Sequence, residues 1–180
     1  MVPVRPIRIL GDPVLRQKAK RVPAIDGSMH KLIDDMIDSM REASGVGLAA
    51  PQIGVSLRVI VIGLPDEEPF ALINPEIVKR SGERTVEEGC LSVPGYRTEN
   101  LTRSVAVVAK GLDRSGRRVR VRGDGDLLAQ ALEHEIDHIN GVLYVDRLAS
   151  NDDLIKIEPP PSPAGEAAVQ SGEGESPRSG

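Results

Sequence analysis

The chain has 180 residues, a formal net charge of −4 at pH 7 and a single cysteine. This length suits one domain with a hydrophobic core, and the charge balance excludes a globally basic surface for a nucleic acid or an anionic membrane. The apolar runs are far shorter than the roughly 20 residues that span a bilayer, and the N-terminus lacks a signal-peptide pattern, so we expect a cytoplasmic protein.

The first quarter of the chain predicts a short helical turn and one amphipathic helix. Asp12 followed by Pro13 is typical of a helix start, because proline fits the first helical position. After Ser28, apolar residues recur at helical spacing until Ser44 and Gly45 interrupt the pattern. These residues are Met29, Leu32, Ile33, Met36, Ile37 and Met40. We interpret them as a stripe that faces the core.

The segment from Gly45 to Gln52 is rich in small residues, and neither helix nor turn chemistry alone explains it. Glycines at such a place let the backbone come close to another group. A phosphate-binding loop is excluded, because no Lys-Ser or Lys-Thr pair follows and the next element is a predicted strand. A structural tight turn remains the alternative to a binding role.

The middle of the chain predicts several short strands. They cover residues 57–64, 71–74, 76–79, 104–110 and 117–122, and a turn at residues 113–116 joins the last two. A glycine-containing loop from Glu88 to Gly95 lies between the strands. Because the strands are short and close together, we expect a largely antiparallel sheet. One helix before the strands and one after them predict an α+β fold, in which short-stranded sheets pack around a central metal-binding helix.

The second helix carries two histidines four residues apart, His134 and His138, with Glu135 between them. On a helix this spacing places the two imidazoles on one face, about 5–6 Å from each other, which one metal ion can bridge. Glu135 lies to the side of that face, where a carboxylate can take a proton from water at the metal. Asp126 is the expected N-cap and Gly141 the expected residue after the helix.

Two stripes run along this helix, and both of its sides are expected to be buried. One consists of Leu127, Ala131, His134, His138 and Gly141, and the other, which is apolar, of Leu128, Leu132, Ile136, Ile139 and Leu143. A polar strip remains, formed by Ala129, Glu133, Asp137 and Asn140. A buried pair of neutral histidines needs partners, and one metal ion satisfies both. The alternative is that the two histidines are ordinary core residues that share the spacing by chance.

A hydrolytic metal site needs a third protein ligand and one open position. His30 lies on the polar side of the first helix, where a surface role is expected. The long zinc-protease motif requires a third histidine six residues after His138, but Tyr144 is found there. Cys90 is the remaining soft ligand, although a core thiol or an intermolecular disulfide remains open for a single cysteine.

Three stretches taken together resemble the peptide deformylase family: Gly45 to Gln52, Glu88 to Ser92, and His134 to His138. The resemblance extends from about Leu10 to Leu148. It implies a metal-dependent hydrolase that removes the formyl group from the N-formylmethionyl end of nascent polypeptides and releases formate. Glu133 departs from the family pattern, in which glutamine is frequent, and Asp126 stands where a glycine is common.

The resemblance also assigns roles to the residues of this chain. It implies that Cys90, His134 and His138 hold the metal, and that Glu135 accepts a proton from water and passes it to the leaving amine. The Leu91 backbone N–H and the Gln52 side-chain amide would stabilise the oxyanion. The substrate-binding positions are Gly45, Val46, Gly47, Glu88, Gly89, Arg97, Leu127, Gln130 and Ala131. Asp137 is expected to anchor the helix, with Arg103 as its partner.

The substrate peptide is expected to add to the Gly45–Gly47 backbone as an extra strand, so that residues beyond the formylmethionine are recognised weakly. The family commonly uses Fe²⁺, while Zn²⁺, Ni²⁺ or Co²⁺ can be the ion that is found bound. Two alternatives of different classes stay open. One is a metalloprotease that cleaves internal peptide bonds, and the other is a non-catalytic binding module stabilised by zinc.

The C-terminal region differs in composition from the rest of the chain. Residues 1–157 are expected to form the catalytic domain, and residues 158–180, rich in Pro, Gly, Ser and Glu, a disordered tail. The family's work near the ribosome suggests a docking element. This tail is acidic and proline-rich, so it is no basic docking helix. We expect no membrane contact and no specific nucleic-acid partner.

Overall fold

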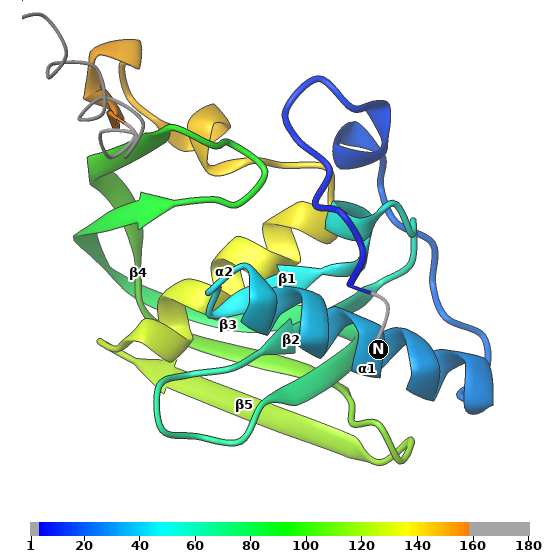
Figure 1. Cartoon of the computed structure of the whole chain (residues 1–180). Helices are drawn as coiled ribbons and strands as arrows, with labels where there is room; N and C mark the ends of the chain where they lie inside the picture. Colours follow the sequence, from blue (N-terminus) through cyan, green and yellow to red (C-terminus); the bar gives the residue numbers. More distant parts are fainter. Residues whose placement is uncertain (1–3, 159–180) are drawn as a thin grey trace, which may run out of the picture.

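The computed structural model describes residues 4–158, which form two α-helices and a curled sheet (Figure 1). The helices are α1 (Gly27–Glu42) and α2 (Leu127–Ile139). The strands are β1 (Gly47–Ala49), β2 (Val59–Ile62), β3 (Phe70–Gly89), β4 (Tyr96–Leu112), β5 (Arg118–Asp124) and β6 (Leu154–Lys156). Short 3-10 helices cover Pro13–Arg16, Ala50–Ile53, Tyr144–Arg147 and Asn151–Asp153. The predicted α+β class is confirmed.

Helix α1 follows the predicted amphipathic pattern. The Asp26 side chain caps it by accepting a hydrogen bond from the Met29 backbone N–H. The predicted apolar stripe is buried, apart from the partly buried Ile37, against residues of β1, β2 and the start of β3. The short turn at Pro13–Arg16 is also present, and Asp12 caps it as expected.

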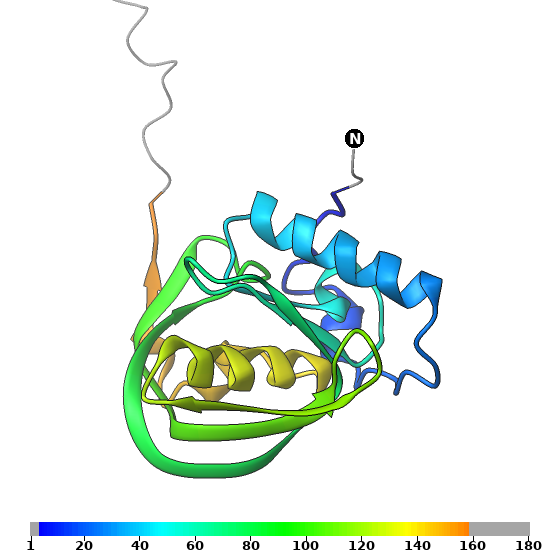
Figure 2. The same ribbon diagram turned by 90° about the horizontal axis from the view of Figure 1, so that it is seen from below.

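The strands form one sheet in which every pairing is antiparallel. Its order is β1-β2-β3-β4-β5, and β6 pairs separately with the start of β4. Figure 2 shows the strands curling around α2, while α1 runs across the outside. Within residues 4–158, β1 is an edge strand, since it pairs with β2 alone.

The predicted strand lengths need correction. The two expected strands at residues 71–74 and 76–79 are parts of β3, which continues to Gly89, and the strand expected at residues 104–110 lies inside the 17-residue β4. The pairing register of β3 with β4 shifts between Ile73 and Glu76, between Ile77 and Lys79, and between Val86 and Glu88. Such bulges bend a strand, and they let these two long strands curl instead of ending.

Helix α2 lies inside the curl and is buried on nearly all sides. Leu132, Ile136 and Ile139 pack against inward-facing residues of β2, β3 and β4. At Gly123 a side chain would collide with the Ala129 backbone, so β5 approaches the first turn of α2 only because this residue is glycine. The surrounding strands therefore hold the predicted metal-binding helix in a fixed position.

Several shorter segments can also be compared with their predicted structure. The small-residue segment at 45–52 contains strand β1 and a 3-10 helix rather than a simple turn. The turn at residues 113–116 is confirmed by the hydrogen bond from the Gly116 N–H to the Asp113 carbonyl. Strand β6 was not predicted. The expected disordered tail lies almost wholly outside the described residues. In residues 4–158, neither helix combines the length and the apolar character that crossing a membrane requires.

Candidate active site

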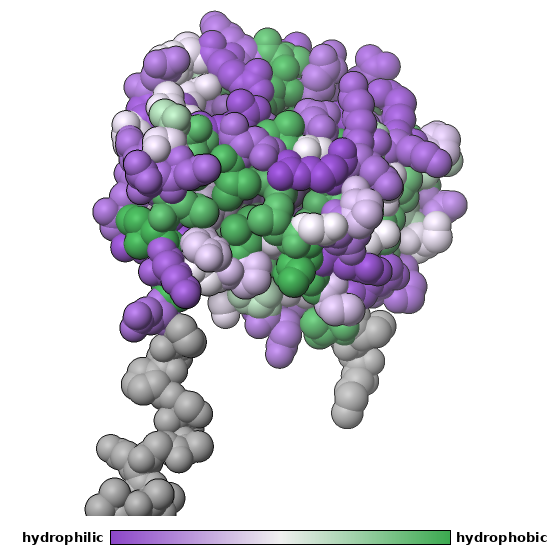
Figure 3. Space-filling model, turned by 90° about the horizontal axis from the view of Figure 1, so that it is seen from above, coloured by the Kyte–Doolittle hydropathy of each residue, from purple (hydrophilic) through white to green (hydrophobic). Residues whose placement is uncertain are grey.

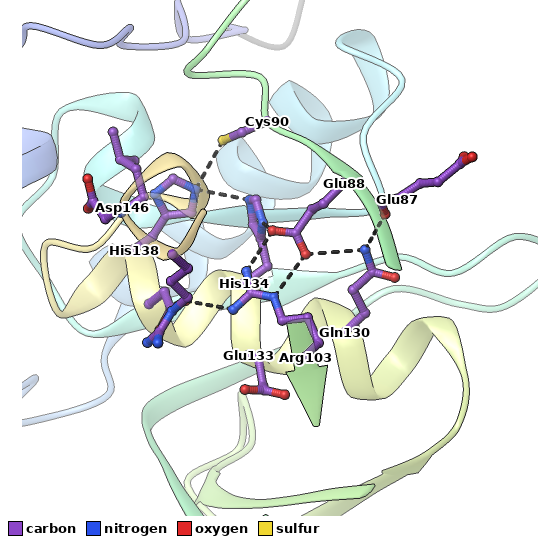
Figure 4. A network of polar contacts seen from close by, with 12 residues as sticks. Glu87, Glu88, Cys90, Arg103, Gln130, Glu133, His134, His138 and Asp146 are labelled. Atoms are coloured by element: carbon purple, nitrogen blue, oxygen red, sulfur yellow. Dashed lines mark hydrogen bonds and ion pairs between the residues drawn. The ribbon is translucent and has the colours of Figure 1, made fainter. Parts of the chain in front are cut away.

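The two histidines of α2 meet as the spacing predicts. Asp126 caps the helix by accepting a hydrogen bond from the Ala129 N–H, and Gly141 follows it with a φ of 77°. The Nε2 atoms of His134 and His138 lie 3.2 Å apart. Figure 4 shows both rings on the same side of the helix, with Cys90 reaching them from the loop that follows β3.

Cys90 supplies the third donor of this cluster. Its Sγ lies 3.2 Å from His138 Nε2, and the donor atoms of Cys90, His134 and His138 all lie within 4.8 Å of one another. The Ser92 N–H donates a hydrogen bond to the same sulfur at 3.4 Å. Tetrahedral bonds of about 2.0–2.3 Å separate neighbouring ligand atoms by roughly 3.3–3.6 Å, so the cluster fits one ion of this kind.

Glu88 orients His134 for such a role. Glu88 Oε2 lies 2.8 Å from His134 Nδ1, which leaves Nε2 of the ring directed at the other two donors. This pattern, a carboxylate behind a metal-ligating imidazole, fixes the ring and its tautomer. Burial opposes protonation of His134, but Cys90, Glu135 and Glu88 together raise its pKa well above the ordinary value. The surroundings therefore favour a positive charge at this place.

Arg103 on β4 ties Glu88 to the helix. It is 2% exposed and makes two contacts with Glu88, at 2.6 and 3.1 Å (Figure 4). A third contact, of 2.8 Å, joins it to Asp137. Asp137 also receives two hydrogen bonds of 2.6 Å from Arg147. Burial acts to raise the pKa of Glu88, but its contacts with His134 and Arg103 lower it to about 2. The structure thus contains the pair that the sequence suggested for Asp137.

The polar strip of α2 is more buried than the sequence indicated. Glu133 and Asp137 are both under 10% exposed. The Glu133 carboxylate accepts a hydrogen bond from the Ser104 N–H and lies 3.4 Å from Arg80. These carboxylates face β3 and β4 because the sheet curls around the helix, which the helical period alone does not reveal.

Glu135 lies beside the donor cluster and is 4% exposed. Its Oε2 has no hydrogen-bond partner among residues 4–158. Burial raises the pKa of this carboxyl to about 7, a shift that a divalent cation nearby would oppose. A buried carboxylate next to a metal-binding cluster can accept and release a proton when one of its oxygens has no hydrogen-bond partner.

Gly47 makes room for Glu135. A Cβ atom at this position would lie 2.5 Å from Glu135 Oε1, so the close approach inferred from the glycine-rich segment is to this carboxylate. We expect Gly47→Ala to lower kcat/KM by about 10²-fold, because a misplacement of about 1 Å costs that much. Metal content should stay unchanged. Gly27→Ala, which lies outside the pocket and whose Cβ would meet no atom within 4 Å, is the comparison variant. Equal activity of Gly47→Ala and the parent would contradict this role.

The side chain of Gln52 lies beside Cys90, and Leu91 is the next residue after Cys90 in the chain. The Gln52 side chain accepts a hydrogen bond from the Ala49 N–H and donates one to the Ser92 hydroxyl at 3.1 Å. Its amide nitrogen also lies 3.7 Å from Cys90 Sγ. The amide is therefore held beside the sulfur by two fixed partners.

A pocket of about 530 Å³ opens in front of these groups. All the predicted substrate-binding residues line it, together with Gln52, Cys90, Leu91, His134 and Glu135. His138 lies behind them and is buried. Figure 3 shows apolar side chains gathered in a band across one face of the molecule. The pocket wall includes four large apolar residues that are more than a third exposed, Val46, Tyr96, Leu127 and Ile157.

Two residues of the pocket wall, Tyr96 and Ile157, were not predicted from the sequence. They line the pocket because β6 pairs with the first residues of β4 and the Ile157 N–H bonds to the Gly95 carbonyl. A three-residue strand beside a proline-rich segment gives too weak a pattern to predict this pairing. Gln130 contacts the pocket as expected, and its amide donates to the Glu87 carbonyl at 2.7 Å and to Glu88 at 3.2 Å.

Comparison with known proteins agrees with this geometry. The family model described as polypeptide deformylase matches residues 4–153. The chain belongs to this family. A peptide deformylase of Dehalococcoides mccartyi (strain CBDB1) is 58% identical over 157 residues, which cover 87% of this chain and 93% of that relative.

Solved deformylase structures share the fold. The peptide deformylase of Legionella pneumophila is 50% identical, with a TM-score of 0.78, over 82% of this chain and 87% of that one. A class I type b peptide deformylase of Acinetobacter baumannii with Met-Ala-Ser bound is 35% identical, with a TM-score of 0.78, over 82% of this chain and 100% of that one. The chain described here is accordingly a peptide deformylase, a metal-dependent hydrolase with a Cys/His/His group.

Proposed function

We propose that this deformylase hydrolyses the formyl amide at the N-formylmethionyl end of nascent polypeptides, with Glu135 as the group that moves the proton. The observation that carries the proposal is the buried carboxylate of Glu135, whose Oε2 has no hydrogen-bond partner among residues 4–158. It lies beside the Cys90/His134/His138 cluster and lines the pocket. The products are formate and a free amino terminus.

Cys90, His134 and His138 are the residues that would hold the ion. When bound, it supplies Lewis-acid chemistry, polarising the formyl carbonyl and making water a stronger acid. We propose Fe²⁺ as the working ion, with Zn²⁺, Ni²⁺ or Co²⁺ able to occupy the same donors, since a thiolate and two imidazoles suit all of them.

Glu135 handles the proton in both halves of the reaction. Its free oxygen accepts a proton from the water whose oxygen forms the new bond to the formyl carbon. As the carbon–nitrogen bond breaks, the same carboxyl delivers that proton to the leaving amine. The Gln52 amide and the Leu91 backbone N–H are proposed to stabilise the oxyanion, since both residues line the pocket. Losing one such donor typically costs about 3–4 kcal/mol.

The peptide is proposed to extend along the edge of the sheet. Strand β1 pairs with β2 alone among residues 4–158, and Gly45, Val46 and Gly47 line the pocket. An extended peptide can therefore add to this edge through backbone hydrogen bonds, which read little of its sequence. The Acinetobacter baumannii deformylase with Met-Ala-Ser bound supports a short peptide as ligand. Arg97, Leu127, Gln130 and Ala131 are proposed as further contacts.

The experiment that tests this function measures formate released from formyl-Met-Ala-Ser. We expect release from this peptide and none of acetate from acetyl-Met-Ala-Ser, with internal peptide bonds left intact. Cleavage of internal bonds would instead support the metalloprotease alternative. Metal binding with no hydrolysis of either peptide would support a non-catalytic zinc-stabilised module.

Cys90→Ser is expected to weaken metal binding and formate release together. An alkoxide is far harder to form than a thiolate, so the ion loses one of its three protein ligands. Metal content after dialysis and kcat/KM measured on the same preparation check this. Full occupancy with full activity would exclude Cys90 as a ligand.

We also propose a cytoplasmic location, because the substrate is a nascent chain. The chain's C-terminal tail, which lies almost wholly outside the described residues, carries four glutamates and one arginine from Glu158 onward. It is not expected to dock the enzyme on ribosomal RNA, because affinity for phosphate comes from lysine and arginine.

A further inference from the structure

A second hollow, of about 690 Å³, lies at the far end of β4 from the pocket. Strand β4 begins at Tyr96 in the pocket wall and ends at Leu112 in the wall of this hollow. Four cationic side chains line the hollow, together with one carboxylate. The cations are Arg21, Lys110, Arg118 and Arg120, and the carboxylate is Glu76.

The register of the sheet explains why cations gather here. In β5, Val119 and Val121 pack toward α2, so the alternate residues Arg118, Arg120 and Arg122 point to the outer face and are exposed. Paired residues of antiparallel strands share a face. Lys110 on β4 pairs with Arg120, and Glu76 on β3 pairs with Lys110.

The next row of the sheet extends this surface. Val108 pairs both with Arg122 on β5 and with Lys79 on β3, so these two cations share its face. We call the resulting surface the basic face, and it consists of Arg21, Lys79, Lys110, Arg118, Arg120 and Arg122. It crosses three neighbouring strands.

Acidic residues offset only part of this charge. Glu76 lies 3.5 Å from Lys110 and Asp124 lies 2.9 Å from Arg122, and all four side chains are more than half exposed. The six cations and two carboxylates leave four net positive charges on a chain whose net charge is −4. Within residues 4–158, Arg118 and Arg120 form no ion pair.

We propose that the basic face docks the phosphodiester backbone of RNA without regard to its sequence. Rows of arginine and lysine on adjacent strands offer several charges to successive phosphates, and arginine binds phosphate through a planar fork. The residues that line the hollow include no aromatic side chain on which bases could stack, so the backbone is the part that is recognised. Because the pocket and the basic face share no residue, docked RNA leaves the pocket open.

The test is fluorescence anisotropy of a short labelled single-stranded RNA titrated with the full chain. If about four phosphates are neutralised, log K should fall with log salt with a slope near −3, since each contact contributes about −0.7. Removing two contacts with Arg118→Ala and Arg120→Ala together should weaken binding about 20-fold at about 0.1 M salt and flatten the slope. Replacing both arginines by lysine keeps the charge and should retain most of the affinity.

The comparison variant removes the same charge elsewhere, with Arg41→Ala and Lys156→Ala, which are exposed and lie off the basic face. It should bind RNA like the parent. The Arg118/Arg120 variant should keep the parent's thermal unfolding and formate release, because both side chains are exposed and outside the pocket. Unchanged RNA affinity in that variant, or an equal loss in the comparison variant, would overturn the proposal. Tighter binding of polyglutamate or of phosphatidylglycerol vesicles than of RNA would overturn it as well.

Discussion

Glu135→Gln is expected to lower kcat/KM for formate release by about 10²- to 10⁴-fold, the contribution usual for a positioned acid–base group. Glutamine has nearly the same shape, so it fits beside Gly47 without moving the cluster. It cannot take a proton from water. Metal content and thermal unfolding should therefore match those of the parent, and the loss should appear in kcat.

The comparison variant for this change is Glu133→Gln. Glu133 is on the same helix and equally buried, but its carboxylate contacts the Ser104 N–H and Arg80 instead of lining the pocket. The same chemical change should leave formate release within a few-fold of the parent. If Glu135→Gln retained activity within about tenfold of the parent, the acid–base role would be wrong.

Arg103→Met is expected to lower the free energy of unfolding by about 3 kcal/mol, at the lower end of the cost of removing one partner of a buried ion pair. Methionine keeps the volume but leaves Glu88 buried without its guanidinium. Asp137 still keeps Arg147. Because Glu88 also orients His134, metal affinity should fall too. Urea unfolding and metal content measure the two effects.

An exposed pair provides the control for Arg103. Arg114 lies 2.8 Å from Asp34, and both side chains are about half exposed. Exposed pairs contribute at most about 1 kcal/mol, so Arg114→Met should change stability by less than that. If the two substitutions lowered the free energy of unfolding equally, burial would not be the reason why the Arg103 ion pairs stabilise the fold.

The helices and the metal cluster were predictable because their signals are local. The apolar stripe of α1 and the His134–His138 spacing depend only on the helical period. Cys90 was reached by exclusion of His30 and Tyr144, which works in a chain with few candidate ligands. The geometry then places all three donors together.

The long strands and the buried network were less predictable because they depend on distant pairing. Residues 78–87 of β3 are mostly exposed and polar, so their alternation is too weak to distinguish a strand from a loop. Arg103 looks like any polar residue of a strand until the curl of the sheet encloses it with Glu88 and Asp137. The pairing of β6 with β4, which brings Ile157 to the pocket, also depends on tertiary structure.

The most direct test of metal-dependent hydrolysis at this site is an anaerobic metal titration in which formate release is measured. The protein is stripped with a chelator and reloaded stepwise with Fe²⁺, and formate release from formyl-Met-Ala-Ser is measured at each step. Among residues 4–158 one such cluster is found, Cys90/His134/His138, and it predicts that activity is absent at the start, rises linearly and stops rising at one ion per chain. Full activity in the stripped protein, or activity that is not proportional to the amount of bound metal, would contradict a metal-dependent mechanism at this cluster.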